Sequence, residues 1–285
     1  MDYETIIVDR YGTDNRIGLI TLNRPDKLNS LSKQLLNELE HGLKSMATDD
    51  RIRVIVIRGS GRGFGAGYDQ TPAPDGRDNS DDAPIRGFLT GARKDLQEGA
   101  KRQMYIFNMP KVVIAQVHGY CLAGSCEYAM MADLVVAAED ARIGHPGVRG
   151  LGHPRNSCLW PMVIGMRKAK ELMYTGDTLS GTEAAEIGMI NKAVPEEKLE
   201  EEVTFLADRI ANQTADSLAV HKEALNRWYQ AMGMESSIMA AADYDLMYYF
   251  SGSAKAFNEK VQEVGMKEAF TWRDTPYKDG RSKSK

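Results

Sequence analysis

The sequence predicts an α/β fold that ends in a helical region. As far as about residue 195, short apolar runs rich in β-branched residues alternate with stretches of helical periodicity. From residue 197 to about residue 270, helical patterns follow one another with almost no strand signal. Because alternating strands and helices are typical of α/β folds, we expect an α/β core over residues 1–196 and a helical region over residues 197–285.

The N-terminal part is expected to form a hairpin, a helix and a strand. Residues 5–8 and 17–22 are β-rich runs on either side of a polar turn. Residues 35–46 place apolar side chains on one helical stripe, and residues 53–58 are too short and too rich in β-branched side chains for a helix. The polar, proline-containing residues 71–84 then indicate a mobile loop or lid.

Further helices and strands are expected in the middle of the chain. A helix is expected near residues 85–106, and a buried strand at residues 111–117. Residues 124–131 indicate a helix that begins with small residues, and residues 134–138 the next strand. From Ser157 onwards the pattern becomes helical, so short strand–helix units recur along the core.

Composition excludes several classes of protein. A chain of 285 residues with 42% hydrophobic residues has enough apolar surface for a packed core. The formal net charge of -4 is spread without large blocks, so we expect no nucleic-acid partner. No apolar run approaches the roughly 20 residues of a membrane span, and no signal-peptide pattern begins the chain, so we expect a cytoplasmic protein without membrane association. Cysteine spacing indicates neither a disulfide framework nor a metal site.

Two glycine-flanked segments follow buried strands and could bind an anion. They are residues 64–69 (FGAGYD) and residues 118–127 (HGYCLAGSCE). Glycine lets the main chain approach a ligand closely, and a free N–H at a helix start stabilises negative charge. Two such donors directed at one point would form an oxyanion hole, although on spacing alone both segments could simply turn the chain. Neither has the spacing of a dinucleotide-binding or ATP-binding loop.

Six short motifs occur in a fixed order and are distributed along nearly the whole chain. They are residues 23–31 (NRPDKLNSL), 64–69 (FGAGYD), 117–127 (VHGYCLAGSCE), 175–177 (TGD), 184–190 (AAEIGMI) and 256–260 (AFNEK). In this combination and order the sequence resembles the crotonase (enoyl-CoA hydratase/isomerase) superfamily. The resemblance implies a spiral core of ββα units and a C-terminal helical region that forms a homotrimer or a dimer of trimers and completes the CoA site. It also implies an acyl-CoA thioester as substrate, with no metal and no cofactor besides the substrate's own CoA.

The resemblance also assigns binding roles to individual residues. The backbone N–H groups of Tyr68 and Gly124 would hold the thioester oxygen as an enolate forms. The positions expected to contact substrate or CoA are Lys27, Leu28, Ala66, Asp69, Phe257 and Lys260. The last two would reach the CoA of a neighbouring subunit. For Asp69 the alternative is a hydrogen bond to loop backbone.

The acid and base residues depart from the pattern of family hydratases, which use two glutamates around one water. Glu127 matches the first glutamate, but Gly147 occupies the position of the second. The new residues nearby are His145, His153, Arg149 and Arg155. Of these, histidine can act as acid or base near neutral pH. We therefore expect Glu127, with His145 or His153, to be catalytic.

Several reactions fit this set of residues. The leading expectation is an enoyl-CoA hydratase-like lyase with one retained glutamate. The alternatives within the family are a double-bond isomerase and a hydrolase that cleaves a C–C bond of a β-dicarbonyl. An inactive homologue that only binds acyl-CoA, and a diketone hydrolase that needs no CoA, belong to other functional classes.

Overall fold

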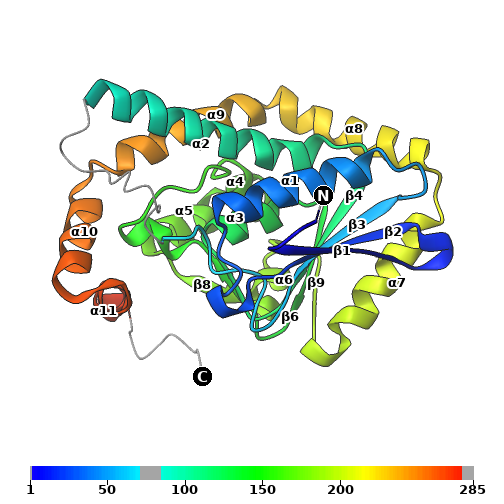
Figure 1. Cartoon of the computed structure of the whole chain (residues 1–285), viewed down its shortest axis with the longest axis horizontal. Helices are drawn as coiled ribbons and strands as arrows, with labels where there is room; N and C mark the ends of the chain where they lie inside the picture. Colours follow the sequence, from blue (N-terminus) through cyan, green and yellow to red (C-terminus); the bar gives the residue numbers. More distant parts are fainter. Residues whose placement is uncertain (1, 71–84, 278–285) are drawn as a thin grey trace.

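A mixed six-stranded sheet forms the centre of the protein (Figure 1). The structure, a computed structural model, describes residues 2–70 and 85–277, so the expected loop at 71–84 lies outside the described residues. In spatial order the strands are β1 (Ile6–Tyr11), β2 (Ile17–Leu22), β3 (Val54–Gly59), β4 (Val112–Val117), β6 (Leu134–Ala138) and β9 (Lys192–Val194). Within this sheet β1 and β2 pair antiparallel, which confirms the predicted hairpin. The remaining neighbours are parallel, and the predicted α/β class is confirmed.

A smaller sheet lies beside the first and contains β5 (Tyr120–Leu122), β7 (Arg142–Gly144) and β8 (Thr178–Ser180). β4 and β5 are consecutive strands that belong to different sheets, and helix α3 (Gly124–Met130) follows them. β6 and β7 are divided between the two sheets in the same way. The recurring unit is therefore two strands followed by helical structure, as the predicted ββα spiral requires.

Helices α1 and α7 are among those that pack on the large sheet. α1 (Lys33–Ala47) contacts β1 and β2, and it buries the apolar stripe that predicted a helix at residues 35–46. The Ser32 side chain accepts a hydrogen bond from the Leu35 N–H at 3.2 Å, which caps the helix start. α7 (Leu199–Ala211) contacts β2, β3, β4 and β6. The sheet is thus covered by helices from both ends of the chain.

The C-terminal region is helical, as predicted. It contains α8 (Ala215–Ala231), α9 (Met234–Tyr248), α10 (Gly252–Val264) and α11 (Met266–Asp274). α9 packs along α2 (Ile85–Asn108), whereas α10 and α11 form an arm at the left of the view (Figure 1). The remaining α-helices of the described residues are α4 (Leu159–Ile164), α5 (Met166–Thr175) and α6 (Gly181–Glu186), and the 3-10 helix η3 (Pro146–Arg149) follows β7. Among the described residues, no helix is long and apolar enough to cross a membrane.

Candidate active site

Backbone hydrogen bonds join the two glycine-flanked segments. The Gly65 N–H donates to the Tyr120 carbonyl at 2.7 Å, and the Leu122 N–H donates back to the Gly65 carbonyl at 3.0 Å. The Gly67 N–H donates to the buried Ser125 hydroxyl at 3.0 Å. The loop after β3 is therefore fixed against β5 and the start of α3.

This connection brings Tyr68 and Gly124 together. A Cβ added at Gly124 would overlap the Tyr68 ring, and one added at Gly67 would lie 3.4 Å from the Gly124 nitrogen. Neither the Tyr68 N–H nor the Gly124 N–H donates to a backbone or side-chain acceptor within the described residues. Ala123, just before α3, has a φ of 48°, a conformation that L-residues adopt only at a cost. The two predicted oxyanion residues are thus neighbours beside a strained turn.

A cavity of about 340 Å³ opens beside this turn. Of the predicted site residues, the cavity wall includes Ala66, Tyr68, Glu127, His145 and His153. The wall also includes Asp245 of α9, Tyr249 directly after α9, and three residues of α11, namely Phe270, Arg273 and Asp274. The cavity therefore combines the strand-end loops with the C-terminal helices of the same chain.

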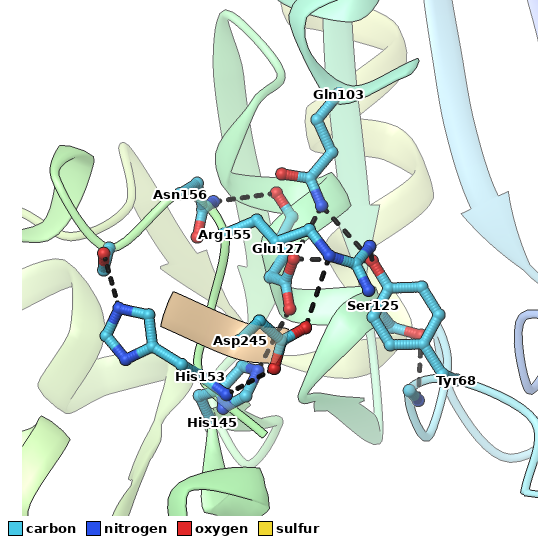
Figure 2. A network of polar contacts seen from close by, with 11 residues as sticks. Tyr68, Gln103, Ser125, Glu127, His145, His153, Arg155, Asn156 and Asp245 are labelled. Atoms are coloured by element: carbon cyan, nitrogen blue, oxygen red, sulfur yellow. Dashed lines mark hydrogen bonds and ion pairs between the residues drawn. The ribbon is translucent and has the colours of Figure 1, made fainter. Parts of the chain in front are cut away.

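Glu127 is the central charged group of this cavity (Figure 2). It lies on α3 and is only 2% exposed. The Gln103 amide donates to Oε2 at 2.6 Å, and the Tyr68 hydroxyl lies 3.4 Å from the same oxygen. Burial alone would raise the pKa of Glu127, but the His145 hydrogen bond, the charge of Arg155 and the Gln103 hydrogen bond lower it to about 2. The carboxylate is therefore ionised at neutral pH.

His145 forms a direct pair with Glu127. His145 Nε2 lies 3.0 Å from Glu127 Oε1, and the imidazole is buried. Nε2–H is the donor to an ionised carboxylate, which leaves Nδ1 of a neutral imidazole as an acceptor. Nδ1 has no hydrogen-bond partner within the described residues. A Cβ at Gly147 would lie 2.8 Å from His145 Cε1, so the imidazole fills the space beside the position where family hydratases have their second glutamate.

His153, the other histidine expected to be catalytic, does not contact Glu127. His153 Nε2 lies 2.9 Å from the Ser157 hydroxyl, and the His153 backbone N–H donates to Asp245 Oδ1 at 2.8 Å. Burial lowers the pKa of its imidazole, and His153 still lines the cavity. The structure thus pairs His145, and not His153, with Glu127.

Three polar residues around Glu127 were not among the predicted site residues. Gln103 belongs to α2, Asp245 to α9, and Arg155 to the segment before α4 (Figure 2). Arg155 donates to the Tyr68 hydroxyl, and its guanidinium lies 4.5 Å above the Tyr68 ring centroid. Gln103 and Asp245 are buried polar residues on helices, and their helical pattern gave no sign that Gln103 contacts Glu127 or that Asp245 lines the cavity.

The residues expected to bind CoA are divided between the cavity rim and other places. The Leu28 carbonyl accepts a hydrogen bond from the Ala66 N–H at 3.0 Å, so the turn at Leu28 lies beside the cavity wall. Leu28 has a φ of 49°, and its neighbour Lys27 is exposed. Asp69 forms an ion pair with Arg24 at 2.7 Å and is not part of the wall.

Phe257 and Lys260 lie on α10, outside the cavity wall. Phe257 is 1% exposed and packs against Phe270, whose ring centroid is 5.5 Å away. Lys260 pairs with Glu263 at 2.6 Å. Within this chain the Phe257–Phe270 contact joins α10 to α11, whereas Lys260 and Glu263 both lie on α10. The described residues contain no cluster of three or more side chains that could hold a metal ion.

Comparison with known sequences identifies one protein family. The sequence profile described as enoyl-CoA hydratase/isomerase matches residues 12–274. A protein of Mycobacterium bovis named as a probable enoyl-CoA hydratase is 33% identical over 271 residues, which cover 93% of this chain and 95% of that protein. A protein of Rhizobium meliloti with the same description is 35% identical over 232 residues, covering 80% and 83% of the two chains.

Solved structures show the same similarity. The crystal structure of an enoyl-CoA hydratase from Mycobacterium smegmatis matches with a TM-score of 0.89 and 29% identity, over 98% of this chain and 96% of the other. An enoyl-CoA hydratase/isomerase from Xanthobacter autotrophicus matches with a TM-score of 0.81 and 28% identity, over 96% and 99% of the two chains. The similarity therefore extends to the helical C-terminal region.

Proposed function

Because this chain belongs to the enoyl-CoA hydratase/isomerase family, we propose that it is a hydratase-like lyase in which a His145–Glu127 pair performs the acid and base steps. The hydrogen bond between His145 and Glu127, formed beside Gly147, is the observation that supports this proposal. The substrate would be an acyl-CoA thioester, with no cofactor besides its CoA.

The first step is stabilisation of an enolate. Attack on the β-carbon of an enoyl thioester moves electrons onto the thioester oxygen. Backbone N–H groups that face this oxygen stabilise it more as its negative charge grows. The proposed donors are the N–H groups of Tyr68 and Gly124. Two observations support this proposal: the two residues are neighbours in space, and neither N–H group has an acceptor among the described residues.

Proton transfer is assigned to His145, with Glu127 as its partner. Glu127, with a pKa of about 2 and two bound donors, is a poor base at neutral pH. It would fix the tautomer of His145 and stabilise the imidazolium, as a carboxylate does in a catalytic triad. His145 would accept a proton from water while the water oxygen bonds to the β-carbon. The imidazolium would then protonate the α-carbon, so that one water adds across the double bond.

We also propose that residues beside the cavity and on α10 bind the CoA part of the substrate. Lys27, Leu28 and Ala66 would contact the CoA. This proposal is supported by the hydrogen bond from Ala66, which lines the cavity, to Leu28. Phe257 and Lys260 would meet the CoA of a neighbouring subunit in a homotrimer or a dimer of trimers. The arm that carries them reaches away from the sheets (Figure 1).

A second candidate is hydrolytic cleavage of a C–C bond in a β-dicarbonyl thioester. The observation that favours it is the same imidazole, because an imidazole paired with a carboxylate can activate water for attack on a carbonyl. The products would be a carboxylic acid and a shorter acyl-CoA, rather than a hydroxyacyl-CoA. Product analysis therefore separates the two reactions.

Turnover of crotonyl-CoA tests the leading proposal. We expect Glu127→Gln and His145→Phe each to lower kcat by about 10²- to 10⁴-fold, since each removes part of the acid–base pair. His153→Phe is the matched control and should lose less than about 10-fold, because His153 does not contact Glu127. Unchanged turnover in Glu127→Gln would refute the assignment. Retained thioester binding without turnover of any enoyl or β-keto thioester would identify an inactive binding homologue.

A further inference from the structure

Arg155 is buried at the reaction site but uses few of its hydrogen-bond donors. The residue is 7% exposed and lines the cavity. Within the described residues its only hydrogen bond runs from Nη1 to the Tyr68 hydroxyl. Nε is buried and 3.5 Å from Asp245 Oδ2, an ion-pair distance without a hydrogen bond. A buried guanidinium with unused donors is costly, so an acceptor on a bound ligand would be stabilised here.

The guanidinium is held in a fixed place. It stacks on the Tyr68 ring, with its carbon 4.5 Å from the ring centroid. On another side it packs against α2, where a Cβ at Gly99 would lie 2.6 Å from Nη1. A donor fixed in this way loses little entropy when a ligand binds. Arg155 is therefore organised for binding before any ligand arrives.

The charged groups around Arg155 make this part of the wall unsuitable for a hydrocarbon chain. Glu127 already accepts hydrogen bonds from His145 and Gln103, and Arg273 is paired with Asp274 at 2.8 Å. An alkyl chain laid against Arg155 and Asp245 would remove water from both without replacing its hydrogen bonds. A substrate oxygen beside Arg155 would replace them.

We propose that Arg155 is a specificity-determining residue that binds an oxygen acceptor, a ketone or a carboxylate, on the acyl part of the substrate. This inference rests on the proposed function, because it takes an acyl-CoA thioester as the ligand. The substrate class is then an oxygen-bearing acyl-CoA rather than a simple alkenyl-CoA. Asp245 balances the charge of Arg155 and positions it.

Length-matched thioesters test this inference. We would compare kcat/KM for trans-2-pentenoyl-CoA, 4-oxo-2-pentenoyl-CoA and glutaconyl-CoA, whose acyl groups end in a methyl, a methyl ketone and a carboxylate. The wild type should prefer one of the oxygen-bearing thioesters by about 10- to 100-fold, the range of a charge-assisted hydrogen bond. Which one it prefers distinguishes a ketone from a carboxylate. Arg155→Met should abolish the preference.

A matched control separates specificity from general damage. Arg102 lies on α2 outside the cavity wall and pairs with Glu40 at 2.8 Å, so Arg102→Met should keep the wild-type ratio between thioesters. The inference is overturned if the wild type prefers the alkenyl thioester. It is also overturned if Arg155→Met lowers kcat/KM equally for all three.

Binding of unreactive analogues distinguishes failure of this inference from failure of the proposed function. Calorimetry with pentanoyl-CoA, 4-oxopentanoyl-CoA and glutaryl-CoA needs no turnover. Tighter binding of an oxygen-bearing analogue by the wild type, and its loss in Arg155→Met, supports the role of Arg155 even if no hydration occurs. Equal binding of all three analogues, together with hydration of crotonyl-CoA, would support the proposed function and refute the role of Arg155.

Discussion

Glu127 depends on side chains from several distant segments for its ionisation. His145 follows β7, Gln103 comes from α2, and the charge of Arg155 comes from the segment before α4. These groups together outweigh the burial that would otherwise raise the pKa of Glu127. A substitution at any of these three residues is therefore expected to change the pKa of Glu127 although Glu127 itself is unchanged.

Gly124→Ala is a residue-scale prediction. The added Cβ would overlap the Tyr68 ring, so the ring or the adjacent backbone has to move. We expect turnover to fall by about 10²-fold, because the proposed oxyanion donors lose their alignment. Steady-state kinetics with crotonyl-CoA measures this.

The control for this substitution is Gly91→Ala. Gly91 lies in α2, where an added Cβ would meet no atom within 4 Å. Alanine favours a helix by about 1 kcal/mol over glycine, so stability should rise and turnover should not fall. Equal turnover of the Gly124 and Gly91 variants would contradict the expected crowding.

Asp245 is expected to make stability depend on pH. Burial raises its pKa to about 6 from the ordinary value of 3.8, although Arg155 and the His153 N–H act in the opposite direction. Because the folded pKa is the higher one, the stabilisation is complete below pH 3.8 and is lost as pH rises through about 6. Relative to Asp245→Asn, the wild type should lose up to about 3 kcal/mol between about pH 4 and about pH 7.

Urea denaturation of both proteins at several pH values measures this difference. Asp243→Asn, an exposed change on the same helix, is the control and should not reproduce it. Parallel stability curves for the wild type and Asp245→Asn across this range would contradict the prediction.

Sequence patterns located part of the site but not its pairing. Glu127, Tyr68 and Gly124 belong to motifs with a recognisable order, so their positions could be predicted. Whether His145 or His153 contacts Glu127 depends on the path of the chain after β7. The periodicity of apolar residues in the sequence does not predict that path. Asp245 was not predicted, because a buried acid on a helix follows the same pattern as an exposed one.

At the scale of elements, the central feature is the junction between the loop after β3 and the start of α3. Ser125 is fully buried and accepts from the Gly67 N–H. Ser125→Ala would leave that N–H buried without its acceptor, at a cost of about 1 to 3 kcal/mol. Because Tyr68 follows Gly67, we also expect turnover to fall about 10-fold, which steady-state kinetics with crotonyl-CoA would measure.

Ser180→Ala provides the comparison. Ser180 caps α6 through a hydrogen bond from the Glu183 N–H at 3.1 Å, away from the cavity wall. Its loss should cost about 1 kcal/mol of stability and leave turnover unchanged. If both serine variants retain full turnover, the junction does not position Tyr68.

The long elements were predictable, and the short strands were not. The expected strand at residues 134–138 is β6, and the expected helix near residues 85–106 is α2. β5, β7, β8 and β9 are 3 residues each, too short for a period-two pattern to stand out. Their pairing comes from tertiary contacts, so the second sheet appears only in the structure.

At the scale of the whole molecule, Lys222 connects the helical region to the core. From α8, its ammonium group donates to the Ile106 carbonyl at 3.1 Å, the Lys111 carbonyl at 2.9 Å and Asp133 Oδ2 at 2.7 Å. Lys222→Met would leave Asp133 without its cation. We expect a loss of about 3 to 5 kcal/mol in the free energy of unfolding, measured by urea denaturation.

A double substitution controls for the buried charge. Asp133→Asn keeps an oxygen for the Val113 N–H, which now donates to Asp133 Oδ2 at 2.7 Å. Lys222→Met combined with Asp133→Asn should therefore be more stable than Lys222→Met alone. If the double variant is the less stable of the two, the loss does not come from an unpaired carboxylate.

The cavity wall includes residues from Ala66 to Asp274, and so it combines loops of the α/β core with helix α11. During synthesis from the N-terminus, Glu127 and Arg155 leave the ribosome long before α11, which completes their enclosure. A nascent chain that does not yet contain α11 therefore carries these charged groups in contact with solvent, and it acquires the complete cavity wall only after α11 has been made and has folded.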